Sequence, residues 1–473
     1  MINSFPRYFA KRAIAVYMAL LILIPIVFGY PMTWYWWAFG IVEVVVFFSF
    51  GSTLSQSWSR AREKDFLKNV FGLALILRLA YVTFSYFFYI NVNGMFFEFN
   101  AADSYTYHLF AEHGADMIKR GEFNFKQQFE TLGYLRNLDA NDVGYPVILS
   151  FWYFLTNKSI FLARVMRSVI SAATVALVYR IAQRNFNEPV ARMTAIFCTL
   201  MPNFIYYCST GLKETDMLFV TVLFLDRADN VIRGRVSMWQ LVWVFLIGAL
   251  AFFYRGVLCA VLFLSFITAL LLSSRKVVSK VKKVAMAIMS VLILATAFGN
   301  NIMEQIEISN FTELQAQQES DMNWRAERSG GNAFASYASS AVFAPLIFTI
   351  PFPTMVNIPG QETQQLIHGG NYVKNITSFF TILALFLLLF SGEWRDKVLP
   401  ISFMIGYLIV LVFSNFAQSE RFHIPILPFS LMFAAYGISQ MTNKRKRWFV
   451  YWLVFIFVAN VGWTWFKLRG RGM

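Results

Sequence analysis

The chain has 473 residues, of which 58% are hydrophobic and only 14% are charged. Soluble domains carry about 25% charged residues, so this composition excludes an ordinary soluble protein. The formal net charge is +15, but the lysines and arginines gather in short loops between apolar runs, as they do in cytoplasmic loops of membrane proteins. A nucleic-acid partner is therefore not expected.

Apolar runs near the length that crosses a bilayer as a helix, about 20 residues, recur along the chain. They are continuous rather than alternating, which favours helices over a membrane barrel. We predict an all-α polytopic membrane protein with about 13 transmembrane helices. Its predicted location is the cytoplasmic (inner) membrane, with the N-terminus inside.

The predicted organisation has four parts. Residues 1–65 form an N-terminal two-helix membrane extension, and residues 66–299 form the membrane core with a first outer loop at 91–158. Residues 300–373 form a long outer loop, because four prolines between positions 345 and 359 disfavour a transmembrane helix there. We expect this loop to lie against the outer leaflet, and residues 374–473 to form the C-terminal membrane helices.

The first outer loop contains the most polar segment near the core, Asn100–Glu122. We expect a helix that begins after Asp103 as its N-cap, ends at Gly121 and lies flat on the outer membrane surface. A second apolar segment that starts at Gly144 is too short to span the membrane. It is predicted to form another juxtamembrane helix.

Asp103 is the leading catalytic candidate. A carboxylate at the membrane surface can act as general base toward a hydroxyl. The neighbouring Tyr105, Tyr107 and His108 supply aromatic groups for a sugar ring, and Glu112 adds a second acid on the same helix. The alternative is that Asp103 only caps the helix.

A second polar cluster, containing Lys213 and Glu214, falls at a short turn between two spans on the same predicted face. These two side chains could pair with each other. Glu214 could instead face Asp103 across an outer cavity, with the two carboxylates within about 15 Å, the scale of one lipid-linked sugar site.

Two further polar features stand at predicted outer ends of spans. Arg255 occupies a tight turn, and Glu420, Arg421 and His423 open a late span. A guanidinium suits phosphate oxygens because its planar fork can donate two parallel hydrogen bonds. Alternatively, Arg421 is a rim residue paired with Glu420 or with a lipid headgroup.

Three more arginines, Arg78, Arg164 and Arg167, lie inside or at the ends of predicted spans. Arginine within a membrane is costly and by default suggests a function. The alternative for each is snorkelling to the interface or an ion pair with an acid on a neighbouring helix.

The order of these features is more specific than any one of them. LILRLAY, DSYTYH, GYPVIL, GLKET, FFYRG and ERFHIPILP follow one another along the chain. This order resembles the glycosyltransferase C superfamily, which includes the protein mannosyltransferases and the lipid A aminoarabinose transferase. The resemblance covers roughly residues 66–441.

The resemblance implies a membrane enzyme that takes a sugar from a polyprenyl-phosphate carrier, with inversion at the anomeric carbon. Matched to the family pattern, Asp103 and Glu214 would be catalytic, with Asp103 as base. The acceptor would be a glycan, lipid or protein, and membrane lipids are further partners. The predicted substrate-binding residues are Tyr105, Tyr107, His108, Glu112, Tyr145, Lys213, Arg255, Glu420, Arg421 and His423.

The chain departs from the family where a second acid often follows the first, because Ser104 stands there. We therefore expect no cofactor and no metal site, although Glu112 or Glu214 could supply metal ligands.

Two other functions remain open from sequence alone. One is an O-antigen or capsule polymerase that joins lipid-linked repeats, since such enzymes also have many spans and a large late outer loop. The other is a transporter or flippase for a lipid-linked sugar. The charges gather at the outer face rather than at mid-membrane, where transport sites lie, which disfavours the transporter.

Overall fold

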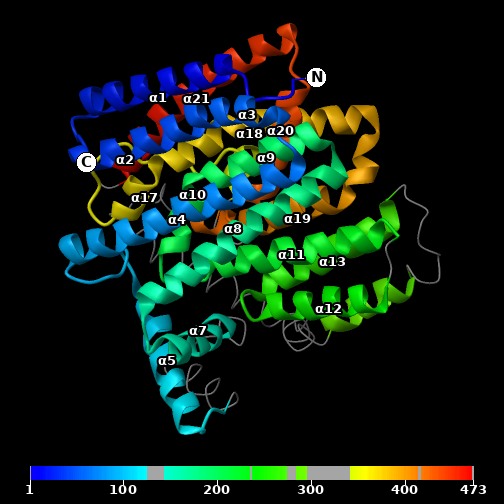
Figure 1. The fold of residues 1–473 in the computed structure, drawn as a ribbon. Coiled ribbons are helices and arrows are strands. Elements are labelled where there is room, and N and C mark those ends of the chain that lie inside the picture. The colour runs from blue at the N-terminus through cyan, green and yellow to red at the C-terminus, as the bar shows by residue number, and fades with distance from the viewer. Residues whose placement is uncertain are drawn as a thin grey trace, which may run out of the picture.

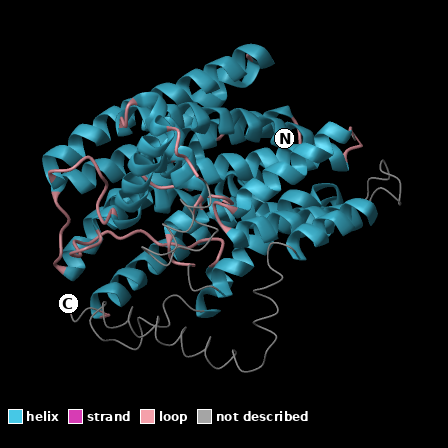
Figure 2. Ribbon diagram, turned by 90° about the horizontal axis from the view of Figure 1, so that it is seen from below, coloured by secondary structure: helices cyan, strands magenta, loops and turns pink. Residues whose placement is uncertain are grey.

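The computed structural model describes residues 2–124, 143–234, 237–273, 284–295, 341–413, 417–470 and 473. Across these ranges the chain is helical or lies in turns and loops, and no strand occurs in them. Most helices run alongside one another in a single bundle, seen from the side in Figure 1 and from below in Figure 2.

The first helices are α1 (Arg7–Phe28), α2 (Trp34–Val45), α3 (Gly51–Ser57), α4 (Glu63–Asn93), α5 (Ala102–Arg120), α7 (Gly144–Thr156), α8 (Ile160–Asn185), α9 (Glu188–Leu200) and α10 (Pro202–Ser209). They are followed by α11 (Glu214–Ile232), α12 (Met238–Phe252), α13 (Gly256–Leu272), an apolar helix at Val284–Ala295, α17 (Glu362–Leu366), α18 (His368–Ser391), α19 (Val398–Phe413), α20 (Leu427–Ser439) and α21 (Asn443–Arg469). A π-helical segment, Val46–Phe50, joins α2 to α3. Short 3-10 turns occur at Trp58–Arg60, Ala341–Leu346, Glu393–Lys397 and Glu420–His423.

Seven helical segments in the described ranges are long and apolar enough to cross a membrane, and four shorter apolar helices accompany them. The prediction of an all-α polytopic membrane protein is confirmed. The number thirteen stays a prediction.

A proline, Pro202, separates α9 from α10. Pro202 has no N–H, so the carbonyl of Cys198, four residues earlier, loses its helical donor. The fully buried Arg78 of α4 donates to the carbonyls of Cys198 at 3.2 Å and Thr199 at 3.3 Å. Arg78 therefore stabilises a helix break through carbonyl groups, rather than through the acid or the interface expected from sequence.

Helix α18 begins at His368, six residues before the predicted start of the C-terminal membrane helices at 374. Its polar first turn is buried and hydrogen-bonded. His368 Nε2 lies 2.8 Å from the Tyr17 hydroxyl, and the Gly370 N–H donates to the Glu43 carboxylate at 2.9 Å. Hydropathy alone cannot recognise polar residues that find partners inside the bundle.

The described part of the long predicted loop packs into the protein. Residues 341–361 form a 3-10 turn and irregular chain, as the prolines indicated. Ile350, Phe352 and Val356 are buried, so this stretch fills the bundle instead of lying on the lipid surface as expected. Residues 300–340 of the predicted loop lie outside the described residues.

The N-terminal helices belong to the same bundle. Helix α1 packs on α21, and α2 packs on α18. The Phe9 ring of α1 lies 5.2 Å from that of Phe380 and 4.9 Å from that of Phe449, in edge-to-face arrangements that stabilise aromatic contacts.

Helices α5 and α7 pack on each other at one end of the bundle, where α5 runs steeply across the direction of most other helices (Figure 1). Helix α5 ends at Gly121 in the left-handed conformation, as predicted. Helix α8 starts beside α5, where Lys158 pairs with Asp116 at 2.8 Å, and ends where Gln183 donates to Glu63 at 3.0 Å. A helix of 26 residues is about 39 Å long, so α5 and the start of α4 lie at opposite ends of the bundle.

Candidate active site

One guanidinium joins the two predicted catalytic carboxylates. Arg421 Nη1 lies 2.7 Å from Asp103 Oδ2, and its Nε lies 3.0 Å from Glu214 Oε1. Asp103 and Arg421 are 318 positions apart in the chain. Because both carboxylates touch the same side chain, they are much closer than the predicted limit of about 15 Å. Their predicted proximity is confirmed.

The three charged groups differ sharply in exposure. The Glu214 side chain is 0% exposed, Arg421 is 26% exposed and Asp103 is 48% exposed. The contact of Arg421 with Glu214 is an ion pair without hydrogen-bond geometry, whereas that with Asp103 is a hydrogen bond. Burial opposes the charge on Arg421, but the carboxylates of Glu214 and Asp103 outweigh it and raise the pKa of Arg421. Asp103 is therefore the more accessible of the two carboxylates.

The structure corrects the expected capping role of Asp103. Helix α5 begins at Ala102, with Ala101 as the N-cap, so Asp103 lies inside the first turn and makes no side-chain cap. An acid in the first turn is still favoured by the positive end of the helix dipole. Its carboxylate instead points to Arg421.

Two more cations gather near this pair. Lys213 directly precedes α11 and is 3% exposed. Burial and the charge of Arg255 lower the pKa of Lys213, and Glu214 opposes the shift, so that the pKa is about 7. Arg255 directly precedes α13, donates to the Tyr407 hydroxyl at 2.9 Å and lies 4.2 Å from the centre of the Phe422 ring. Residues from four segments thus converge on one charged site.

The predicted aromatic residues fall into two groups. Tyr105 is 45% exposed, with its ring 5.8 Å from that of Phe97. Tyr107 and Tyr145 are buried and pack edge-to-face at 5.3 Å, joining α5 to α7. Burial raises the pKa of Tyr107, and the charge of Asp103 raises it further. Of these rings, Tyr105 is the one accessible to a sugar.

His108 and Glu112 face α7 rather than Arg421. His108 Nδ1 lies 2.8 Å from the Tyr153 hydroxyl, and its Nε2 lies 3.7 Å from Glu112. Burial lowers the pKa of His108. The structure does not bring these two residues to the Asp103 carboxylate, so their predicted substrate role has no geometric support.

Glu420 and His423 flank Arg421 but turn into the protein. His423 Nδ1 lies 2.7 Å from Lys374 Nζ, and its Nε2 lies 2.7 Å from the Ala417 carbonyl. Glu420 is 7% exposed, and burial raises its pKa. Arg421 pairs with the two site carboxylates rather than with Glu420, which contradicts the rim pair considered from sequence.

Sequence reasoning missed how the turn before α11 is held. The buried Arg167 of α8 pairs with Asp216 at 2.9 Å and also donates to the carbonyls of Thr210 and Leu212. The ion pair considered for Arg167 is therefore present. A second missed residue is Glu98, a single acid in the apolar stretch GMFFEFN, and this isolation is the signal that could have found it.

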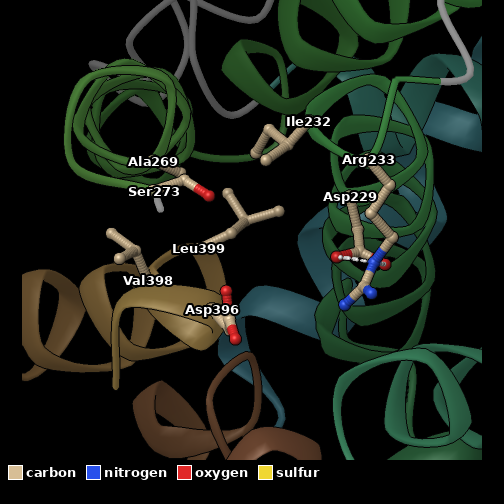
Figure 3. A pocket seen from close by; sticks show the side chains of 8 residues that line it. All are labelled: Asp229, Ile232, Arg233, Ala269, Ser273, Asp396, Val398 and Leu399. Carbon is tan, nitrogen blue, oxygen red and sulfur yellow. Dashed lines mark hydrogen bonds and ion pairs between the residues drawn. The ribbon is translucent and has the colours of Figure 1, made fainter. Parts of the chain in front are cut away.

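A different charged cavity lies at the other end of α11 (Figure 3). Arg233 pairs with Asp229 at 2.9 Å, and Arg184 pairs with Asp229 and Asp226 at 2.7 Å each. The cavity measures about 10 Å³, room for about one water molecule, and is too small for a sugar. Its charges stabilise the packing of α8 on α11, so the Arg421 site is the stronger candidate.

No group of three or more histidine, cysteine, aspartate or glutamate side chains that could hold a metal ion lies within the described ranges. Turnover without a metal stays a prediction.

Residues 143–298 match the family model described as dolichyl-phosphate-mannose-protein mannosyltransferase. This part of the chain is similar to that family. The family belongs to the glycosyltransferase C superfamily, so the resemblance predicted from sequence is confirmed. The match supports a membrane glycosyltransferase of this type. No curated protein and no solved structure matches the chain.

The matched segment contains part of the site. It includes Lys213, Glu214 and Arg255, whereas Asp103 and Arg421 lie outside it. The structure therefore adds to the match the two residues that complete the charged cluster.

Proposed function

We propose that this protein transfers a sugar from a polyprenyl-phosphate carrier to an acceptor hydroxyl on the outer face of the cytoplasmic membrane, with inversion. The observation that carries the proposal is the Arg421 guanidinium, which holds Asp103 at 2.7 Å and Glu214 at 3.0 Å. The family match supports the class of donor.

Asp103 acts as the general base. It takes the proton of the acceptor hydroxyl while that oxygen forms a bond to the anomeric carbon. The bond from this carbon to the phosphate oxygen breaks, and its electron pair leaves on the polyprenyl phosphate. The exposure of the Asp103 carboxylate supports its access to an acceptor, and the exposed Tyr105 ring supports a stacked sugar.

The phosphate binds to the cationic side chains. Negative charge develops on the leaving group, and preorganised cations stabilise such charge most where water is excluded. Arg421, Arg255 and the buried Lys213 supply this field, and the planar fork of Arg421 can grip two phosphate oxygens. Glu214, which is fully buried, positions Arg421 instead of touching the acceptor.

The polyprenyl chain occupies an apolar groove between α2 and α4. The groove has a volume of about 720 Å³ and is lined by aliphatic and aromatic side chains, with Glu43 as the one acid among its lining residues. The groove reaches Tyr206 of α10. The next residue, Tyr207, is close enough to Glu420 and Glu214 to interact electrostatically with both. The groove thus supports a donor whose lipid stays beside the charged site.

The two ends of the bundle support the proposed outer location of the site. The basic loop around Arg60 and Arg62 adjoins the start of α4, and short basic loops lie on the cytoplasmic side. Helix α8 separates this end from α5 by about 39 Å, more than the roughly 30 Å hydrocarbon core. This separation supports an extracytoplasmic position for Asp103, in the first turn of α5.

Transfer with purified protein in nanodiscs tests the proposal. Polyprenyl-phosphate hexoses and pentoses are offered with glycan, lipid and peptide acceptors, and the product linkage is assigned by NMR. We expect release of polyprenyl phosphate and an inverted linkage. Retention of configuration would contradict the mechanism. Elongation of diphosphate-linked repeats would favour the polymerase, and movement of the lipid-linked sugar without bond cleavage would favour the transporter.

A further inference from the structure

A buried carboxylate ties together the two segments that carry the site. Glu98 is 5% exposed. One of its oxygens accepts a hydrogen bond from the Ser104 hydroxyl, and the other accepts from the Gly211 backbone N–H at 3.2 Å. Ser104 directly follows Asp103, and Gly211 precedes Lys213 by two residues. Glu98 therefore links the segment of the base to the segment of the phosphate-binding cation.

The two segments approach as closely as a glycine allows. A Cβ atom on Gly211 would lie 2.6 Å from the Ser104 Cβ, closer than real side chains come. This contact leaves the first turn of α5 directly against the turn before α11. The acceptor oxygens of Glu98 then fix how the two backbones are aligned.

Arg164 is the buried cation that pairs with Glu98. Its Nη2 lies 3.9 Å from the Glu98 carboxylate, and its side chain is 1% exposed. None of its nitrogens has a hydrogen-bond partner among the described residues. Removing one member of such a buried pair leaves an uncompensated charge, whereas replacing both by apolar residues is often tolerated.

The turn before α11 has supports that do not depend on Glu98. Arg167 holds the carbonyls of Thr210 and Leu212 independently of Glu98. Within the described contacts, the first turn of α5 is held at Asp103 by Arg421 and at Ser104 by Glu98. Loss of Glu98 should therefore displace the base more than the phosphate-binding cations.

We propose that Glu98 is a positioning residue that sets the placement of Asp103 relative to the cationic site, acting through Ser104 and Gly211. This inference rests on the proposed function of the same site. A displacement of about 1 Å in a reacting group can reduce a rate about 100-fold. The loss should appear in kcat, with little change in binding of the donor phosphate.

The test replaces the whole pair, so that no buried charge is left behind. Glu98→Leu combined with Arg164→Met should fold and lower kcat about 100-fold. Its affinity for a polyprenyl-phosphate analogue should change less than about threefold, or about 0.65 kcal/mol. Asp116→Asn, which breaks the ion pair to Lys158 farther along α5, is the matched control and should keep full kcat. Ser104→Ala should give a smaller loss than the double variant.

Repeating the double substitution in an Asp103→Asn background separates positioning from a general structural effect. If Glu98 acts through the base, no further loss occurs once the base is gone. An equal loss in both backgrounds, or full kcat in the folded double variant, would overturn the inference.

Hydrogen exchange of the peptide covering Thr210–Glu214 supplies a readout besides activity. The Gly211 amide should exchange faster in the double variant than in the wild type, and its exchange should be unchanged in Asp116→Asn. Equal exchange in all forms would refute the link that Glu98 makes between Ser104 and Gly211. If the wild-type protein transfers no sugar but this difference in exchange is seen, the proposed function is wrong, whereas the link through Glu98 is still supported.

Discussion

Replacement of Arg421 by methionine should destabilise the protein mainly through Glu214. Arg421 serves two carboxylates, but Asp103 is half exposed and such pairs are worth at most about 1 kcal/mol. Glu214 is fully buried, and leaving a buried charge without its partner costs about 3–5 kcal/mol. We therefore expect a loss of about 3–5 kcal/mol in the free energy of unfolding for Arg421→Met.

A double-mutant cycle isolates this term. Adding Glu214→Gln to Arg421→Met removes the unpaired carboxylate charge of Glu214. It should restore most of the lost stability, with a coupling energy of at least about 2 kcal/mol. Activity should not return, because the phosphate has lost its ligand. The free energies come from denaturant titration in mixed micelles, and donor-analogue affinity is measured on the same variants.

Arg421→Lys separates charge from geometry. A lysine ammonium keeps the charge but cannot present the planar fork, so stability should remain near wild type. Donor affinity should fall at least about tenfold, or about 1.4 kcal/mol. Additive stabilities in the cycle, or a lysine variant that binds donor as well as wild type, would refute the role assigned to Arg421.

Three other predictions concern the charged site. Asp103→Asn should lower turnover about 10²–10⁴-fold, which is the usual contribution of a general base. It should change the free energy of unfolding by about 1 kcal/mol or less, because the side chain is half exposed. Kinetics and thermal unfolding of one preparation check both. The pKa of Lys213 in the folded protein, about 7, lies below its ordinary value of 10.5. Between these two pH values the unfolded chain binds more protons than the folded protein, so the stability contributed by Lys213 rises with pH. Donor-analogue affinity should instead fall as pH rises through about 7, and Lys213→Met should abolish that dependence in titrations from pH 6 to 9. Turnover should survive a strong chelator, and activity that is lost with chelator and returns with Mn²⁺ or Mg²⁺ would contradict a metal-free site.

The sequence was sufficient to predict the helical membrane class and the proximity of Asp103 and Glu214, and the family resemblance suggested Arg421 for the same site. Each lies at the end of an apolar segment, and span ends on one face of a bundle are brought together by the packing of the helices. The sequence could not show that Arg421 bridges the two acids, because the bridge depends on a contact between residues 318 positions apart.

Burial explains where sequence reasoning failed. His423 and Tyr107 have the residue types of a sugar site, yet they are buried against Lys374 and Tyr145. Glu98 was overlooked because its neighbours are aromatic, although its partners come from two distant segments. Such pairings are fixed by the tertiary contacts of a side chain, which composition and spacing do not encode.

The most direct test of the central claim compares sugar transfer by wild type, Asp103→Asn and Asp116→Asn in nanodiscs with one accepted polyprenyl-phosphate sugar. The two aspartates lie on the same helix α5, but only Asp103 contacts Arg421 in the described structure. We predict that Asp116→Asn keeps wild-type turnover and that Asp103→Asn loses at least about 100-fold while binding donor and folding normally. Near-wild-type turnover by Asp103→Asn would contradict the account.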